Sequence, residues 1–174
     1  MSHFVVDVES DGPLPGVHSM ISFGIRKVDR ELNISFLGKV KPISENRIEK
    51  AAAVSGVSRE EHLTYDDPAE VMENAKEWIW SVNNKRRPIL WSDNNGYDAA
   101  FMNYYFLQFA GKNPFGWSSR RIGDVFCGLN ENLWFSWRKY CITKHTHDPS
   151  DDAKSNAEAL VWLHDNTKLK FFKE

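Results

Sequence analysis

The sequence predicts an α/β fold with a central β-sheet, and two patterns carry this prediction. Apolar runs with strand character occur at residues 4–9, 19–28, 32–40 and 88–91. Apolar residues at helical spacing occur in the segments that begin near residues 68, 97 and 149. Strands that alternate with helices along a chain are typical of a sheet covered by helices.

Length and composition favour one domain, residues 1–174, with ordinary globular composition. A formal net charge of -2 and a pI near 6.3 argue against a protein that coats nucleic acid by charge alone. Cys127 and Cys141 are too few for a disulfide framework and fit a reducing cytoplasm. The N-terminus lacks a signal-peptide pattern, and no segment approaches the roughly 20 apolar residues needed to span a bilayer. We therefore expect a cytoplasmic protein without a membrane partner.

The first strand ends in two carboxylates, Asp7 and Glu9. Because successive strand side chains point to opposite faces, these two lie on the same face, about 6.6 Å apart along the chain. Acids beside a hydrophobic core need a compensating positive charge, and a divalent metal is the usual one. Taken alone, this pair favours an exposed strand end over a metal site.

The next segments predict a hairpin and then a helix. A turn-rich loop at 11–16 leads to two strands, 19–28 and 32–40, and the short polar link Asp29-Arg30-Glu31 predicts that they pair antiparallel. Residues 42–64 are mostly polar, with a weak helical pattern at 47–54. Asp67-Pro68 reads as an N-cap followed by proline at the first helical position, and Lys85-Arg86-Arg87 is expected to close that helix.

After a short strand at 88–91 and a polar turn, a buried helix is expected from Tyr97 or Asp98 to Ala110, ended by Gly111. Residues 112–123 are expected to form a loop, and residues 124–129 and 132–141 two short helices. The segment 134–140 mixes aromatic and basic residues, as base-stacking surfaces do. The helical spacing of Trp134, Trp137 and Cys141 favours a core stripe instead.

The last helix is predicted to begin at Pro149, capped by Asp148. This places Asp152 in its first turn and His147 just before it. Asp98 likewise falls at the head of its helix. Each acid could be a simple helix-start residue, since acids favour first turns.

Functional crevices of α/β sheets lie beyond strand ends, where Asp7, Glu9, Asp98 and Asp152 could converge. Four carboxylates suit two divalent ions such as Mg²⁺ or Mn²⁺, which assist in-line displacement at a phosphodiester. His147 is the candidate base for water, with His145 as the alternative. A zinc motif of the H-x-H-x-D-H kind is rejected, because Pro149 occupies the aspartate position.

Three motifs together resemble the histidine branch (DEDDh) of the DEDD superfamily of 3′→5′ exonucleases. They are Asp7-Val8-Glu9, then Asn94-Asn95-Gly96-Tyr97-Asp98, then His147 followed by Asp152-Ala153, in that order and on the expected elements. The resemblance covers nearly all of residues 4–163 and includes replicase proofreading subunits and small exoribonucleases. It implies a ribonuclease H-like fold, with a central five-stranded mixed sheet flanked by helices.

The resemblance also implies roles. Asp7, Glu9 and Asp152 would ligate one metal, and Asp7, with Asp98 helping through water, the second. His147 would deprotonate the attacking water, and nucleoside 5′-monophosphates would leave a single-stranded 3′ end. The terminal nucleotide would contact residues of the first two motifs: Glu9, Ser10, Asp11, Gly12 and Tyr97.

Two departures from the common pattern accompany this likeness. Ser10-Asp11-Gly12 stands where many members carry Thr-Thr-Gly, and Asp148-Pro149-Ser150 follows the histidine in place of small, apolar residues. The small, stand-alone domain resembles short exoribonucleases and phage or bacterial exonucleases of this branch, and this likeness implies a slight preference for RNA over DNA and a homodimer. A catalytically silent nucleic-acid-binding module and a ribonuclease H-type endonuclease are the alternative functions.

Overall fold

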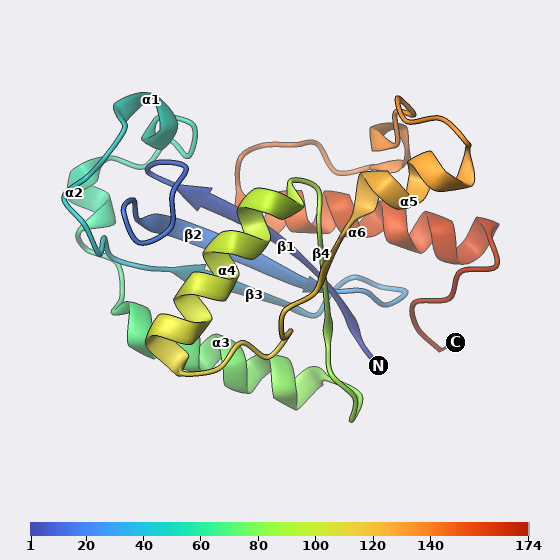
Figure 1. Ribbon diagram of the computed structural model, residues 1–174, viewed down its shortest axis with the longest axis horizontal. Helices are drawn as coiled ribbons and strands as arrows, with labels where there is room; N and C mark the ends of the chain where they lie inside the picture. Colours follow the sequence, from blue (N-terminus) through green and yellow to red (C-terminus); the bar gives the residue numbers. More distant parts are fainter. Residues whose placement is uncertain (174) are drawn as a thin grey trace.

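A five-stranded mixed sheet forms the centre of the computed structural model, which describes residues 1–173 (Figure 1). The strands are β1 (His3–Ser10), β2 (Met20–Lys27), β3 (Ser35–Lys39), β4 (Ile89–Ser92) and β5 (Ser119–Arg121). Their order across the sheet is β3-β2-β1-β4-β5. β1 pairs antiparallel with β2 and β2 with β3, whereas β4 runs parallel to both β1 and β5. The predicted α/β fold with a five-stranded mixed sheet is confirmed.

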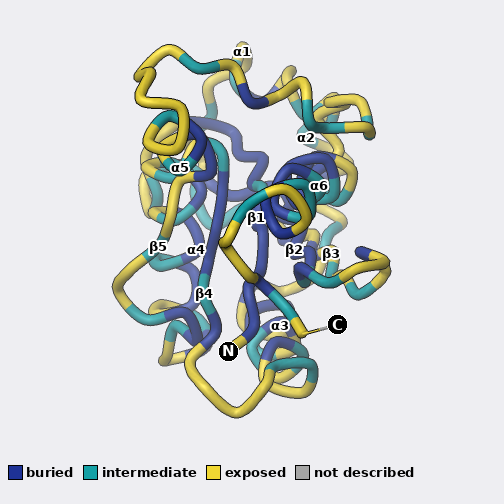
Figure 2. The backbone as a smooth tube through the Cα atoms, turned by 90° about the vertical axis from the view of Figure 1, so that its right-hand side faces the viewer, coloured by how far each residue is buried: buried dark blue, intermediate teal, exposed yellow. Residues whose placement is uncertain are grey.

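Helices cover both faces of this sheet. α3 (Pro68–Val82) and α4 (Asn95–Ala110) pack on one face, in a core that includes Phe4, Val6 and Val8 of β1. α5 (Ile122–Leu129) and α6 (Pro149–Asn166) pack on the other face, in a core that includes Val5. The strict alternation along β1 therefore places Asp7 and Glu9 toward the α6 face. Figure 2 shows the central strands and the inner sides of the helices as buried.

Two short helices, α1 (Glu49–Ala52) and α2 (Arg59–His62), lie between β3 and α3 in the chain. They sit beside the loop that joins β1 to β2 (Figure 1). Arg59 of α2 approaches the buried carboxylate of Asp11 to 3.6 Å, and the Ile48 N–H donates to the Asp11 carbonyl at 2.8 Å. This region, which the sequence left largely unassigned, therefore braces the loop after the first motif.

The predicted helix ends are mostly confirmed at the capping residues. Asp67 accepts a hydrogen bond from the Ala69 N–H, and Asp148 accepts from the N–H groups of Ser150 and Asp151. Gly111 adopts a left-handed conformation after α4, with φ 65°. Some boundaries differ from prediction: α3 already ends at Val82, α4 begins earlier at Asn95, and α5 begins at Ile122.

Two predictions for the region after α4 are wrong. The expected loop at 112–123 contains the edge strand β5, three residues long, which is fixed by parallel pairing with β4. The expected helix at 132–141 is absent from this described segment, where only a 3₁₀ turn, η1 (Arg138–Tyr140), forms. Trp137 is buried, but Trp134 is 92% exposed, so these residues do not form a core stripe. Packing against Phe126, not helical periodicity, decides which rings are buried.

Among residues 1–173, none of the helices combines the length and the apolar character that a bilayer crossing requires.

Candidate active site

β1 brings two of the predicted acids to one place. Asp7 and Glu9 project from the same face of the strand, and one carboxylate oxygen of each lies within 4.8 Å of the other and of an oxygen of Asp152. Opposite Asp7 on β2 lies Gly24. A side chain at Gly24 would place its Cβ only 2.1 Å from the Pro149 carbonyl oxygen. The start of α6 thus rests directly on the β2 backbone, which positions Asp152 beside β1.

Asp152 is held by the residues that precede its helix. Its carboxylate accepts hydrogen bonds from the backbone N–H of Thr146 at 2.9 Å and of His147 at 3.0 Å. The Nδ1 atom of His145 lies 2.8 Å from the same carboxylate. Only 1% of Asp152 is exposed. Because these donors fix its orientation, Asp152 presents a defined oxygen toward Asp7 and Glu9.

Asp98 enters the same pocket from the first turn of α4. Burial raises its pKa to about 8, against hydrogen bonds from Ser92 and the Val8 N–H that act in the opposite direction. Burial is also the main reason that the pKa of Asp7 lies well above its ordinary value, and repulsion from Asp98, Asp152 and Glu9 adds to it. The pKa of Glu9 rises to about 7, through burial and repulsion from Asp152.

These shifts identify a crowded cluster of acids, in which burial and mutual repulsion disfavour ionisation. Carboxylates in such a cluster resist ionisation until a cation compensates them. All-oxygen donor sets of this kind suit hard divalent ions. The residues present therefore fit the binding of divalent metal.

The two candidate histidines lie side by side in front of α6. Their rings meet edge to face, with centroids 4.5 Å apart. Nδ1 of His147 is 3.8 Å from a Glu9 oxygen, whereas His145 pairs with Asp152. His147 adopts a left-handed backbone conformation with φ 62°, which is rare for residues other than glycine. Both imidazoles thus reach the acid cluster, and the choice between them as base stays a prediction.

Glu158 of α6 fixes the segment that leads into the two histidines. The Glu158 carboxylate on α6 accepts from the N–H groups of Ile142 and Thr143 and from the Thr143 hydroxyl. These bonds attach the backbone just before His145 to the helix that carries Asp152. The histidines and Asp152 are therefore fixed to one rigid element.

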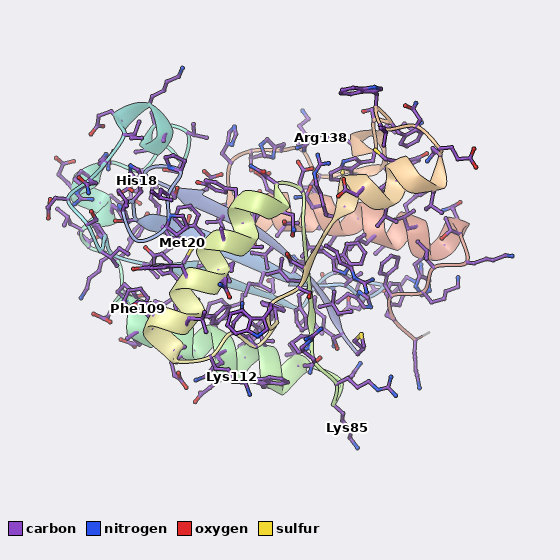
Figure 3. All side chains as sticks on the ribbon, in the orientation of Figure 1. His18, Met20, Lys85, Phe109, Lys112 and Arg138 are labelled. Atoms are coloured by element: carbon purple, nitrogen blue, oxygen red, sulfur yellow. The ribbon has the colours of Figure 1, made fainter. Side chains whose placement is uncertain are left out.

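A pocket of about 460 Å³ opens over the acids. Its wall adds residues that the sequence motifs do not contain, above all Asp93, Arg121 and Arg138. Arg138 forms an ion pair with Asp93, and the Arg121 side chain donates to the Asp93 carbonyl at 3.1 Å. Figure 3 shows Arg138 near the upper edge of the molecule and Lys85 near the lower edge. The sequence signal for Arg138 was the mixed aromatic and basic character of residues 134–140, and Arg121 lay in a stretch expected to be a loop.

Of the residues predicted to contact the substrate, Tyr97 lines the pocket, whereas Asp11 points into the protein. The Tyr97 ring lines the pocket, and its hydroxyl lies 2.5 Å from Oγ of Ser10. Since the Ser10 hydroxyl donates to the Gly12 carbonyl at 2.5 Å, the Tyr97 hydroxyl is the donor toward Ser10. Asp11 is fully buried, accepts from the Ser19 N–H at 2.6 Å and faces Arg59, so its carboxylate lies inside the protein instead of facing the pocket.

Gly12 has a steric reason for its identity. A Cβ there would lie 2.2 Å from the His18 ring, so any side chain would displace that histidine. The Ser10-Asp11-Gly12 departure from the common family pattern therefore forms a compact turn whose charge is paired internally.

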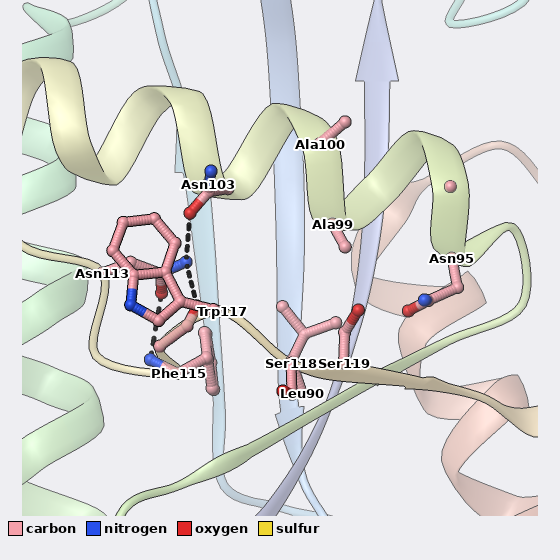
Figure 4. A pocket seen from close by; sticks show the side chains of 12 residues that line it. Leu90, Asn95, Ala99, Ala100, Asn103, Asn113, Phe115, Trp117, Ser118 and Ser119 are labelled. Carbon is pink, nitrogen blue, oxygen red and sulfur yellow. Dashed lines mark hydrogen bonds between the residues drawn. The ribbon is translucent and has the colours of Figure 1, made fainter.

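A second pocket, of about 250 Å³, lies between α4 and the segment that leads into β5 (Figure 4). Trp117, Asn103 and Asn113 line it, together with small residues of α4. Asn113 donates to the Asn103 side chain and to the Gly116 carbonyl, which fixes the loop that carries Trp117. The predicted site residues are not among those that line this pocket.

Solved structures with the same fold are nucleases. The nuclease domain of 3′hExo, a DEDDh family member bound to rAMP, matches 99% of this chain and 96% of its own, with a TM-score of 0.75 and 17% identity. Escherichia coli Exonuclease I in complex with a dT13 oligonucleotide matches 94% of this chain and 41% of its own, with a TM-score of 0.71 and 16% identity. At these identities the likeness shows the fold, which is that of the ribonuclease H-like exonucleases.

A sequence relative is more specific. The 3′-5′ DNA exonuclease Cap18 of Escherichia coli is 37% identical over 162 residues, which are 88% of this chain and 86% of that protein. No protein-family model matches the sequence. With this relative, the fold and the predicted motifs in agreement, the chain belongs to the DEDDh family of 3′→5′ exonucleases. Enzymes of this family use divalent metals.

Proposed function

We propose that this exonuclease removes nucleoside 5′-monophosphates from the 3′ end of single-stranded DNA, with two Mg²⁺ or Mn²⁺ ions held by Asp7, Glu9, Asp98 and Asp152. The observation that carries the proposal is the clustering of these carboxylates: Asp7, Glu9 and Asp98 line one pocket, Asp152 lies within 4.8 Å of Asp7 and Glu9, and the pKa values of the three pocket acids are raised. Bound ions would supply the charge that stabilises the attacking and leaving oxygens of the phosphodiester.

The protein's own groups have distinct tasks in this proposal. Asp152, fixed by Thr146, His147 and His145, and Asp7, fixed on β1, present oxygens to the metal. Glu9 lines the pocket beside Asp7 and would contact the terminal 3′-hydroxyl of the substrate. Tyr97 forms the wall for the terminal nucleotide, and its hydroxyl is anchored on Ser10. Ser10 and Gly12 shape the turn beneath that nucleotide.

His147 is proposed as the general base. Its imidazole is half-exposed and lies beside Glu9, where it can accept a proton from water and return it to solvent, although it is His145 that lines the pocket itself. His145, in contrast, is engaged with Asp152 and serves to position that acid. A positioned base of this kind contributes about 10²- to 10⁴-fold to the rate.

DNA is proposed as the substrate because the 37% identical relative is a DNA exonuclease. This reverses the slight preference for RNA that the likeness to short exoribonucleases implied. The alternative substrate is RNA, since the 3′hExo neighbour binds rAMP. The assembly state and the cellular compartment expected from the sequence stay predictions, and sedimentation of the purified chain tests the expected homodimer.

The decisive experiment is digestion of 5′-labelled single-stranded DNA and RNA with Mg²⁺ or Mn²⁺, each with a chelator control. We expect a ladder that shortens from the 3′ end, faster for DNA, and no products in the chelator. Products of internal size from the start would indicate the ribonuclease H-type endonuclease instead.

Asp7→Ala tests the metal site directly, because it removes the acid at the centre of the cluster. We expect the variant to lose both metal binding, measured by isothermal titration, and cleavage. Cleavage retained in this variant would contradict the two-metal proposal, and absence of cleavage in the unaltered chain would favour a silent binding module.

A further inference from the structure

The segment between α5 and α6, residues 130–148, exposes a tryptophan that the proposed chemistry does not use. Trp134 is 92% exposed and its neighbour Leu133 is 84% exposed. Large apolar side chains at such exposure mark interaction sites when they cluster, although single ones are common. The question is therefore whether the surroundings of Trp134 define a ligand.

The backbone around Trp134 is fixed. The Trp134 N–H donates to the Asn132 side chain at 3.0 Å, and the Phe135 N–H donates to the Asn132 carbonyl at 3.2 Å. The Cys127 thiol of α5 donates to the Leu133 carbonyl at 3.3 Å. These bonds hold the peptide groups on both sides of the tryptophan, so the loop presents the indole in a defined place.

An aromatic cluster beneath the loop explains why Trp134 points outward. The rings of Phe135, Trp137 and Tyr140 stack on or around Phe126 of α5, and Tyr140 also stacks on Trp162 of α6 with centroids 3.8 Å apart. Phe135 occupies the inner position next to Trp134. The cluster is thus complete without Trp134, whose indole is left exposed on a backbone held by hydrogen bonds.

Cations lie in the chain between Trp134 and the histidines. Residues 130–148 contain Arg138, Lys139 and Lys144, and their two acids, Glu131 and Asp148, stand near the ends of the segment. Arg138, four residues after Trp134 and at most about 13 Å farther along the chain, lines the same pocket as Asp7, Glu9 and Asp98. Arg121 lines it too. The pocket's acids repel phosphates, so this side is the one that a polyanion can approach.

We propose that Trp134, with Arg138 and Lys139, binds the substrate strand a few nucleotides upstream of its 3′ end, by base stacking on the indole and by contact of the cations with phosphates. The inference rests on the proposed function. Exposed aromatics beside cations are the arrangement that binds single strands without sequence preference, since every base has a face to stack. The structure favours a nucleic-acid strand over a second protein chain because the cations continue from the loop into the catalytic pocket.

The test compares Trp134→Ala, Trp134→Phe and the matched control Trp117→Ala. Trp117 is also highly exposed, at 82%, but lies at the second pocket (Figure 4). Each protein is assayed on single-stranded oligonucleotides of increasing length and on the p-nitrophenyl ester of thymidine 5′-monophosphate, which is too short to reach the loop. Binding of a fluorescent 12-mer is measured by anisotropy with the chelated protein.

Trp134→Ala is expected to raise KM for the long oligonucleotide and weaken 12-mer binding by about tenfold, with an unchanged rate on the ester. Trp134→Phe and Trp117→Ala should match the unaltered protein. Unchanged 12-mer binding in Trp134→Ala, equal loss in Trp117→Ala, or parallel loss on the ester would each overturn the proposal.

Two further outcomes are distinguishable from these. If the unaltered protein cleaves neither substrate, the proposed function fails, and the anisotropy comparison still decides whether Trp134 binds the strand. If Trp134→Ala alters the sedimentation mass while oligonucleotide kinetics stay the same, the tryptophan belongs to a protein interface and the proposal is wrong.

Discussion

Asp98 places an ionisable group where the metal-free fold disfavours its charge. Its pKa is raised to about 8 by burial, whereas an unfolded aspartate titrates near 3.8. Between these values the folded protein holds a proton that the unfolded chain has lost. Rising pH therefore favours unfolding across this window, and Glu9, with a pKa raised to about 7, acts in the same direction.

From this we expect Asp98→Asn to stabilise the metal-free protein at pH 8, on the order of 3 kcal/mol, and to change little at pH 4. The amide keeps the shape and the hydrogen-bonding capacity of the carboxyl but cannot ionise. Urea unfolding in a chelator at both pH values measures the effect. Equal stability of the two proteins at pH 8 would show that ionisation of Asp98 does not destabilise the folded protein. The variant should lose cleavage whatever its stability.

The two histidines can be separated by single substitutions. His147→Ala should lower kcat by about 10²- to 10⁴-fold and leave Mn²⁺ affinity nearly unchanged, because the imidazole is proposed to move a proton without holding the metal. His145→Ala should mainly weaken Mn²⁺ binding, since it removes a partner of Asp152. Oligonucleotide turnover at saturating Mn²⁺ and titration calorimetry report the two effects. A greater kcat loss in His145→Ala would assign the base to His145.

At the scale of elements, the contact between β2 and the start of α6 carries a steric requirement. Gly24 faces the Pro149 carbonyl so closely that a Cβ would overlap it. The atoms that a Cβ would meet are backbone atoms of α6, so relieving the overlap requires a shift of the helix itself. Gly24→Ala should push α6, and with it Asp152 and His147, away from β1. We expect a loss of about 1–3 kcal/mol of stability and reduced turnover.

Gly128→Ala is the control for this prediction, because nothing lies within 4 Å of a Cβ at that position in α5. Alanine in a helix is favoured over glycine by up to about 1 kcal/mol, so the control should be neutral or slightly more stable. Denaturant midpoints and specific activities of both variants give the comparison. A stable, fully active Gly24→Ala protein would show that α6 tolerates the shift.

The elements also show what a sequence pattern can and cannot reveal. Long amphipathic helices such as α3 and the capped start of α6 were predictable because their signals are local. β5 was not, since three polar residues have too little alternation to identify a strand and only pairing with β4 defines it. The helix predicted at residues 132–141 is wrong because the aromatic residues there pack around Phe126 without forming a helix.

At the scale of the whole molecule, two hydrophobic cores share one sheet. One lies under α3 and α4 and the other under α5 and α6, and β1 contributes side chains to both. Because β1 belongs to both cores, unfolding one core removes β1 from the other and exposes it. The proposed single domain, residues 1–174, should therefore unfold in one step. Far-ultraviolet circular dichroism and tryptophan fluorescence should give coincident urea transitions. Separate midpoints would indicate two independently folding parts.

The residues of the candidate site that belong to sequence motifs were predictable, and those that form the pocket wall were not. Asp7, Glu9, Asp98, Asp152 and His147 lie at ends of predicted elements, and their spacing matched a family pattern. The walls of the pocket follow from tertiary contacts instead. Arg121, at the end of β5, and Arg138, in the segment after α5, both contact Asp93, and no local pattern specifies these contacts. Asp11 shows the converse, because its position in the motif does not reveal that its carboxylate points inward toward Arg59.

The shortness of β5 has a consequence for association between molecules. An edge strand exposes unpaired backbone groups that another strand can extend, and proteins limit this with short edges and charged side chains. β5 has three residues, two of which are the exposed arginines 120 and 121. A foreign strand would gain few hydrogen bonds there and would meet positive charge. This edge is therefore protected against sheet extension, and two copies of the chain would have to associate through another surface.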